Sequence, residues 1–117
     1  MDFTKISHGL TTIFKVRGSL DSESDEVLNL KMAILDELKS GNKKNIILNF
    51  EQVELIDVLS IAHLLECLRI VRKRGGDLKL VNPNTFVQQV LHEHSVSHFF
   101  EIYPTESQAM VSSRKVA

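Results

Sequence analysis

Residues 45–81 read NIILNFEQVELIDVLSIAHLLECLRIVRKRGGDLKLV. The first six residues form a short, nearly continuous apolar run with branched side chains, which favours a strand buried on both faces. After a connection at 51–57, apolar residues recur at helical spacing from about Val58 to Val71, and a glycine pair ends this helix. The chain returns as a strand from Asp77. This stretch therefore predicts a strand–helix–strand unit of a parallel sheet with a right-handed crossover.

The upstream segment continues the alternation toward the N-terminus. Residues 3–17 are rich in β-branched and aromatic residues around a break at His8-Gly9, which predicts two strands joined by a turn. A helix follows, with Asp21 or Ser22 as its N-cap and Gly41 as its C-terminal stop. The first strand can pair antiparallel with the second and so cover an edge of the sheet.

The downstream segment adds a helix, a short strand and a final helix. Asn82-Pro83-Asn84-Thr85 is typical of a turn and helix cap, and 99–103 predicts a short strand before a helix that opens at Pro104. The inward face of the intervening helix is predicted to consist of Phe86, Val87, Val90 and Leu91.

Together these elements predict an α/β fold in one domain, with a central, mostly parallel sheet of four to five strands and about four helices. The domain is expected to span residues 1–112, with a frayed tail at 113–117. The length of 117 residues suits one hydrophobic core and leaves no room for a separate catalytic domain.

Composition excludes several functional classes. The formal net charge of -1 gives no field that would attract nucleic acid or an anionic membrane. The single cysteine, Cys67, allows no intrachain disulfide and fits a reducing compartment. The N-terminus lacks the pattern of a signal peptide, and no apolar run approaches the roughly 20 residues of a membrane span. We therefore expect a cytoplasmic protein without direct membrane insertion.

Candidate catalytic chemistry is sparse. No glycine-rich phosphate loop follows a strand, and Cys67 lies among apolar neighbours, where an inert packed thiol is expected. The group His92-Glu93-His94 with His98 has metal-ligand residue types, but His92 and His94 point in different directions on a helix. We interpret these histidines as solvated, and we expect no enzyme activity, no metal and no cofactor.

The connection into the second predicted helix is the strongest candidate site. Residues 55–62 leave a buried strand, and Asp57 can cap the helix that follows. In open α/β sheets, ligand and partner sites gather at the carboxyl ends of strands. A hydroxyl in the first turn would suit a phosphate, because helix N-terminal N–H groups favour anions. The simpler alternative is a capped helix without a further role.

At this point the chain resembles the STAS domain family, typified by anti-sigma factor antagonists. The resemblance covers nearly the whole length, and its motifs in order are GSLD (18–21), NIILNF (45–50), VELID (53–57), RGGDLKLV (74–81) and IYPTE (102–106). It implies the STAS fold and a surface that binds a protein partner.

The chain departs from this family at the phosphorylation motif. In phosphoregulated members the loop reads Asp-Ser-Ser/Thr-Gly-Leu-Gly, and a partner kinase phosphorylates its second hydroxyl residue. Asp57 matches, but Leu59 occupies the phosphoacceptor position and has no hydroxyl. Ser60 comes one residue late, which rotates its side chain by about 100° on a helix. Ser60 is thus the remaining candidate acceptor, and the usual switch is expected to be missing.

The resemblance implies a partner-binding surface made by Asp21, Asp57, Val58, Leu59, Ser60 and Ala62. The leading hypothesis is binding to an anti-sigma factor or switch-kinase partner that regulates transcription in a bacterium, without phosphorylation of the loop. The alternatives are an accessory subunit of an ABC-type membrane transporter and an oligomerising STAS scaffold. We expect a monomer or weak homo-oligomer.

Overall fold

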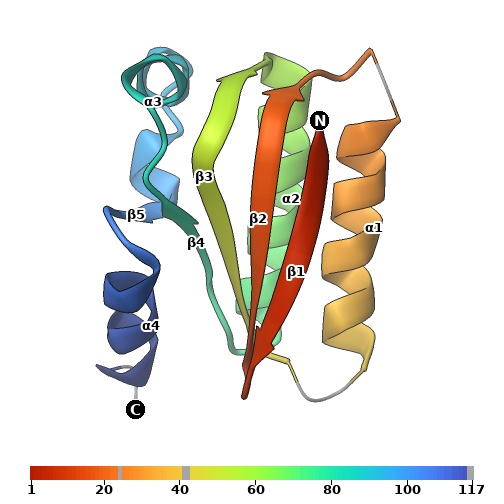
Figure 1. The fold of residues 1–117 in the computed structure, drawn as a ribbon, viewed down its shortest axis with the longest axis vertical. Helices are drawn as coiled ribbons and strands as arrows, with labels where there is room; N and C mark the ends of the chain where they lie inside the picture. Colours follow the sequence, from red (N-terminus) through yellow and green to blue (C-terminus); the bar gives the residue numbers. More distant parts are fainter. Residues whose placement is uncertain (24, 41–42, 116–117) are drawn as a thin grey trace.

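The computed structural model describes residues 1–23, 25–40 and 43–115, and its five strands form one mixed sheet. The strands, in chain order, are β1 (Asp2–His8), β2 (Thr11–Leu20), β3 (Asn45–Ile56), β4 (Leu78–Val81) and β5 (Glu101–Tyr103). They lie side by side in that same order; β1 pairs antiparallel with β2, and every later pair is parallel (Figure 1). The predicted α/β fold with a mostly parallel sheet is confirmed.

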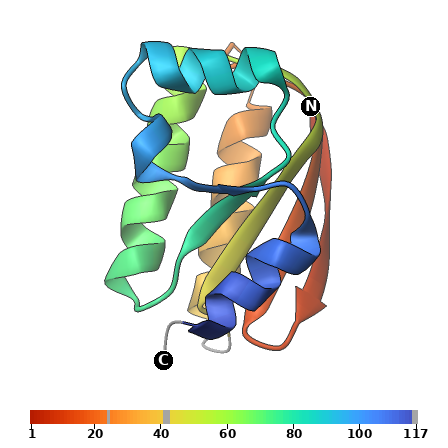
Figure 2. The same cartoon turned by 90° about the vertical axis from the view of Figure 1, so that its left-hand side faces the viewer.

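Helices lie on both sides of the sheet. The described helices are α1 (Glu26–Lys39), α2 (Val58–Lys73), α3 (Thr85–Glu93) and α4 (Glu106–Lys115), with a 3-10 turn, η1 (Ser97–Phe99), after α3. Helices α1 and α2 cover one face and α4 packs on the other, whereas α3 lies at one end of the sheet (Figure 1). Figure 2 shows α3 lying across one end of the sheet and η1 descending beside α2.

Two apolar clusters hold these layers together. The larger lies between the sheet and helices α1 and α2, and it also includes Val87 and Leu91 of α3. The smaller joins α4 to the opposite face through Ile13, Ile47, Val81 and Ala109. The continuous apolar character of 45–50 follows from this arrangement, because a central strand is buried on both faces.

Strand β3 is longer than the sequence predicts. It runs to Ile56, so the expected connection at 51–57 is wrong except at Asp57. The extension pairs parallel with the end of β2, where Gly18 faces Val53 and Leu20 faces Ile56 across two register shifts. These shifts interrupt the polar–apolar alternation that would have indicated a strand.

Helix α1 begins later than predicted. Its first residue is Glu26, and the preceding residue, Asp25, makes no capping hydrogen bond through its side chain. The expected caps Asp21 and Ser22 are therefore wrong; both belong to the turn after β2. The predicted stop at Gly41 lies outside the described residues.

The other helix ends agree better with the sequence. Helix α2 begins at Val58 with Asp57 as its cap, and Asn84 caps α3 by accepting from the Val87 N–H. The prediction that Phe86 points inward is wrong, because its side chain is 55% exposed. The frayed tail at 113–117 stays a prediction: α4 includes 113–115, and 116–117 lie outside the described residues.

Candidate functional site

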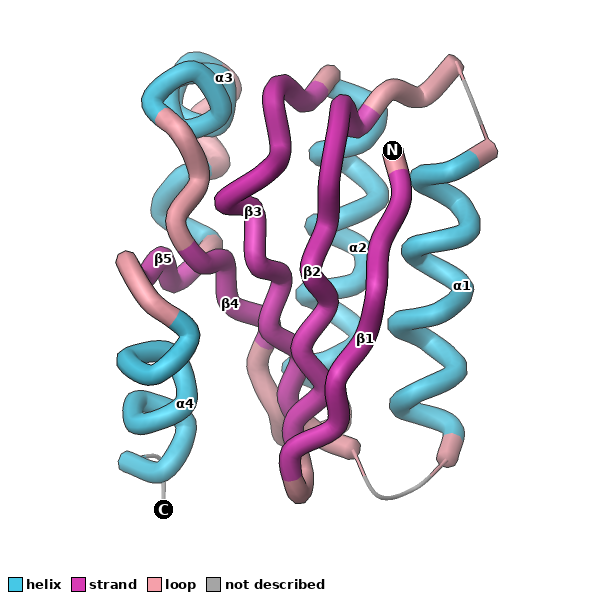
Figure 3. The backbone as a smooth tube through the Cα atoms, in the orientation of Figure 1, coloured by secondary structure: helices cyan, strands magenta, loops and turns pink. Residues whose placement is uncertain are grey.

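The carboxyl ends of β2 and β3 meet at one edge of the sheet. Figure 3 shows the chain leaving β3 directly into α2 at this edge, next to the loop that follows β2. The Asp57 N–H donates to the Leu20 carbonyl at 3.1 Å, which fixes the start of α2 against the end of β2. The site predicted around Asp57 therefore includes two loops that are far apart in sequence.

Asp57 connects these two loops through its carboxylate. Its Oδ1 accepts from the Ser60 N–H at 2.8 Å, which is the N-cap bond of α2. Its Oδ2 accepts from both the N–H and the hydroxyl of Ser22, at 2.9 and 2.7 Å. Partial burial raises the pKa of Asp57, but the hydrogen bonds from Ser22 and Ser60 outweigh it and lower the pKa to about 2. The carboxylate is therefore ionised at neutral pH.

The structure corrects the expected role of Ser60. Its side chain is fully buried, and its hydroxyl donates to the Leu20 carbonyl at 3.0 Å. In this conformation the Ser60 side chain therefore contributes nothing to an exposed surface. The sequence spacing could have indicated the burial of Ser60, because Ser60, Leu64 and Leu68 recur every four residues and share the buried face of α2.

The exposed part of the predicted site is apolar. Val58 is 50% and Leu59 62% exposed, and Ala62 is also exposed. Positions three and four apart on a helix are neighbours, so these side chains form one patch, called here the α2 first-turn surface (Val58, Leu59 and Ala62). Leu55 of β3, which lies in the predicted segment 55–62 but not among the predicted contact residues, is 43% exposed.

Asp21 lies in the turn after β2, next to Leu20, whose carbonyl accepts from the Asp57 N–H. It is half-buried, and its Oδ1 accepts from the Glu23 N–H at 2.8 Å. That bond shapes the turn after β2, which carries Ser22 toward Asp57. The predicted surface role of Asp21 remains a prediction.

Other candidate sites offer little chemistry. Among the described residues no group of three His, Cys, Asp or Glu side chains could hold a metal ion. His92, His94 and His98 are exposed. Cys67 is buried, and that burial raises its pKa to about 11, so the thiol stays protonated.

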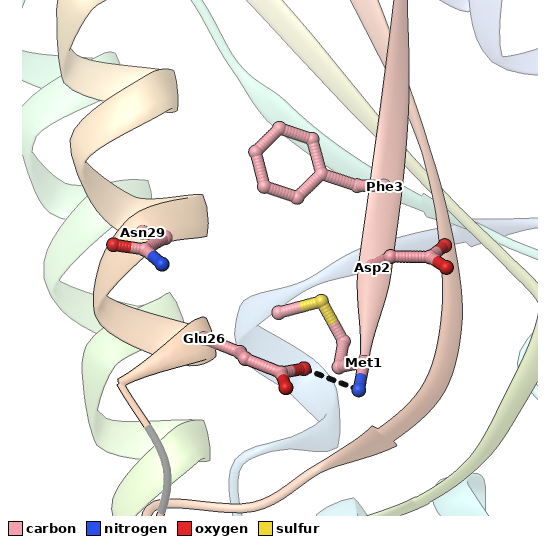
Figure 4. A pocket seen from close by; sticks show the side chains of 5 residues that line it. All are labelled: Met1, Asp2, Phe3, Glu26 and Asn29. Carbon is pink, nitrogen blue, oxygen red and sulfur yellow. Dashed lines mark ion pairs between the residues drawn. The ribbon is translucent and has the colours of Figure 1, made fainter.

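A hollow of about 250 Å³ lies between β1 and the first turn of α1, lined by Met1, Asp2, Phe3, Glu26 and Asn29 (Figure 4). Its charged groups are paired. The Met1 amino group forms an ion pair with Glu26, and Asp2 pairs with Arg17 at 2.7 Å. The hollow therefore gives no support to a catalytic site.

No helix in the described part of the chain is long and apolar enough to cross a membrane.

Comparison with known proteins gives a consistent match over nearly the whole chain. The STAS domain family model matches residues 3–109. A protein of Thermotoga maritima named as an anti-sigma factor antagonist is 32% identical over 85 residues, which is 73% of this chain and 75% of that protein.

Solved structures show the same fold. A crystal structure of an anti-sigma factor antagonist of Thermotoga maritima has 30% identity and a TM-score of 0.83, covering 96% of this chain and 94% of that one. The anti-sigma factor antagonist SpoIIAA in its unphosphorylated form also gives a TM-score of 0.83, at 22% identity and 99% coverage of both chains.

Proposed function

Because the chain belongs to the STAS domain family, we propose that it is a protein-interaction module that binds an anti-sigma factor or a related switch-kinase partner and so regulates transcription. The contact is made by the α2 first-turn surface. Asp57 holds this turn in place, and Asp21 borders it. No catalytic step and no cofactor belong to this function.

The observation that carries the proposal is the exposure of Val58 and Leu59 on a rigid turn. In the isolated chain the Leu59 side chain is 62% exposed, although the opposite face of α2 is buried. Exposed apolar side chains that cluster at one site are typical of a protein contact. The turn is already ordered by the Asp57 hydrogen bonds, so binding costs little additional conformational entropy.

The proposal also includes the absence of the family's usual switch at this loop. Leu59 provides no hydroxyl, and the Ser60 hydroxyl would have to leave the Leu20 carbonyl before a kinase could reach it. A phosphate on Ser60 would also lie near the ionised Asp57 carboxylate, which repels it.

The first test is a binding measurement with Leu59→Asp. Each anti-sigma factor and switch kinase encoded in the same genome is titrated with the protein by calorimetry. We expect one of them to bind, and Leu59→Asp to weaken that binding by about 10-fold or more, because a charge is forced into an apolar contact. Met32→Asp is the matched control, since Met32 is 56% exposed on α1, away from this surface.

Equal binding by Leu59→Asp and the wild-type protein would refute the proposed surface. Binding only to a permease or its ATPase would instead support the transporter alternative. Phosphate recovered on Ser60 after incubation with a cognate kinase and ATP would contradict the unswitched version.

A further inference from the structure

A second pocket lies on a different part of α2, against the 3-10 turn η1. Figure 2 shows η1 beside the helix. The pocket has a volume of about 370 Å³ and is lined by Leu65, Leu68, Arg69, Arg72 and Phe99. The four α2 residues fall at spacings of three, four and seven, so they form one stripe of the helix. The floor of the pocket is thus apolar and its rim carries two guanidinium groups.

The wall opposite α2 is held in position by Arg72. Its Nε donates to the Asp77 carboxylate at 3.1 Å, and its Nη2 donates to the Phe99 carbonyl at 3.0 Å. These bonds tie η1 to α2 and to the start of β4. The Phe99 ring, which is 45% exposed, is therefore presented from an ordered backbone.

Arg69 is the available cation of the pocket. Within the described residues it forms neither a hydrogen bond nor an ion pair, and its side chain is exposed. Its charge helps to lower the pKa of Glu66, after the larger effect of Lys31. The Glu66 carboxylate, however, is paired with Lys31 at 2.9 Å. The Arg69 guanidinium therefore keeps all its donors for another acceptor.

We propose that this pocket binds a small amphipathic carboxylate. Its alkyl or aryl part packs against Leu65, Leu68 and Phe99, and its carboxylate accepts a bidentate hydrogen bond from Arg69. A guanidinium is a planar fork that matches a carboxylate in this way. The volume falls within the roughly 300–1,000 Å³ typical of small-molecule sites. The site lies outside the α2 first-turn surface, so it stands independently of the proposed partner contact.

The test is a titration of the isotope-labelled protein with octanoate, followed by amide chemical shifts. We expect saturable shifts at residues 65–72 and at Phe99. Arg69→Gln should weaken octanoate binding by about 10-fold, as expected for loss of a charge-assisted bidentate contact. Lys73→Gln, which removes an exposed charge from the same helix outside the pocket, should leave it unchanged.

Octan-1-ol serves as the neutral ligand of equal chain length, and it should bind more weakly than octanoate. The proposal is overturned if octanoate gives no saturable shifts, if the shifts fall elsewhere, or if octan-1-ol binds equally well. Octanoate affinity that is unchanged in Arg69→Gln overturns it as well. A failure here leaves the partner contact at Leu59 untouched, because neither ligand nor variant involves that turn.

Discussion

At the scale of single residues, the Asp57 carboxylate has the most consequences. One oxygen satisfies an N–H at the start of α2, and the other accepts two hydrogen bonds from Ser22, 35 residues earlier in the chain. A neutral amide has one accepting oxygen and could keep only one of these two sets of hydrogen bonds. Asp57 therefore sets the position of the first turn of α2 relative to the end of β2.

Replacing Asp57 should destabilise the protein measurably. In Asp57→Asn an NH2 group, which cannot accept, replaces one carboxylate oxygen, so either the Ser60 bond or the Ser22 bonds are lost. We expect the free energy of unfolding at neutral pH to fall by about 1–2 kcal/mol, measured by urea denaturation. Asp36→Asn is the control, because Asp36 is exposed on α1 and should change stability by less than about 0.5 kcal/mol. Equal effects of the two substitutions would contradict the structural role of Asp57.

The sequence predicts only part of this residue-level arrangement. The cap bond from Asp57 to Ser60 is local, since an Asp three residues before a Ser N–H at a helix start is enough to indicate it. The bond to Ser22 depends on β2 and β3 lying side by side, which no local pattern shows. The burial of Ser60 could have been inferred from its spacing with Leu64. Its hydroxyl instead led to the prediction that Ser60 is an exposed contact residue and a candidate phosphate acceptor.

At the scale of elements, the join between α2 and β4 tolerates little change. A Cβ added at Gly76 would lie 1.7 Å from the Lys44 carbonyl oxygen, which belongs to the segment leading into β3. The neighbouring Gly75 has a φ of +87°, but a Cβ there would meet nothing within 4 Å. The two glycines therefore serve different purposes: Gly75 allows the turn, and Gly76 allows two backbones to approach.

These purposes predict different costs for the same substitution. Gly75→Ala should cost about 1 kcal/mol, because an L-residue is strained at positive φ. Gly76→Ala should cost about 3 kcal/mol or more, or prevent folding, because backbone must move to relieve the overlap. Urea denaturation and the yield of folded protein measure both. Equal stability of the two variants would show that the approach to Lys44 is not tight.

The ends of an element could be predicted where local residues, such as a cap or a glycine, determine them. They could not be predicted where pairing with another strand determines them. Helix α2 carries a cap, an apolar stripe and a glycine stop, so its range could be inferred closely. The second half of β3 is formed by pairing with β2 across two register shifts, which break the alternation of its side chains. Such an extension follows from tertiary contacts and not from the pattern of the segment itself.

At the scale of the whole molecule, the layered α/β architecture follows from the order of strands and helices, which the sequence does show. The larger apolar cluster includes the apolar stripe predicted for α2 and the inward residues Val87 and Leu91 predicted for α3. The exposed surface was harder to predict. Leu55 and Phe86 are apolar but exposed, because burial depends on where neighbouring elements end.

The whole molecule should also be sensitive to acid. Four described carboxyl groups have lowered pKa values in the folded state: Asp57, Glu37 through hydrogen bonds from Thr12 and Lys5, Glu66 through its pair with Lys31, and Glu101 through the Tyr103 hydroxyl. Such groups bind fewer protons when folded than when unfolded, so acidification favours unfolding. The Asp57 contribution is complete above its unfolded pKa of 3.8 and is lost as the pH falls toward about 2. The glutamate contributions are complete above the unfolded pKa of 4.5 and are lost at lower pH.

The measurement is the urea midpoint across this pH range. We expect the midpoint to fall between about pH 6 and about pH 3, and to fall less steeply in Asp57→Asn, which lacks one of the titrating groups. The two curves should approach each other toward pH 3 and meet only below about pH 2, where Asp57 is protonated in the folded state as well. A variant whose curve stays parallel to that of the wild-type protein would show that Asp57 does not contribute to the acid sensitivity.

The spatial order of the strands, which repeats their order along the chain, bears on how this protein is made. As the polypeptide leaves the ribosome, each new strand finds its partner strand already outside the exit tunnel. No strand has to be inserted between two others that have already paired. Assembly can then proceed outward from the β1–β2 hairpin. At each stage the sheet has two unpaired edges, β1 and the most recently added strand, and these are the edges that nascent chains on neighbouring ribosomes could reach.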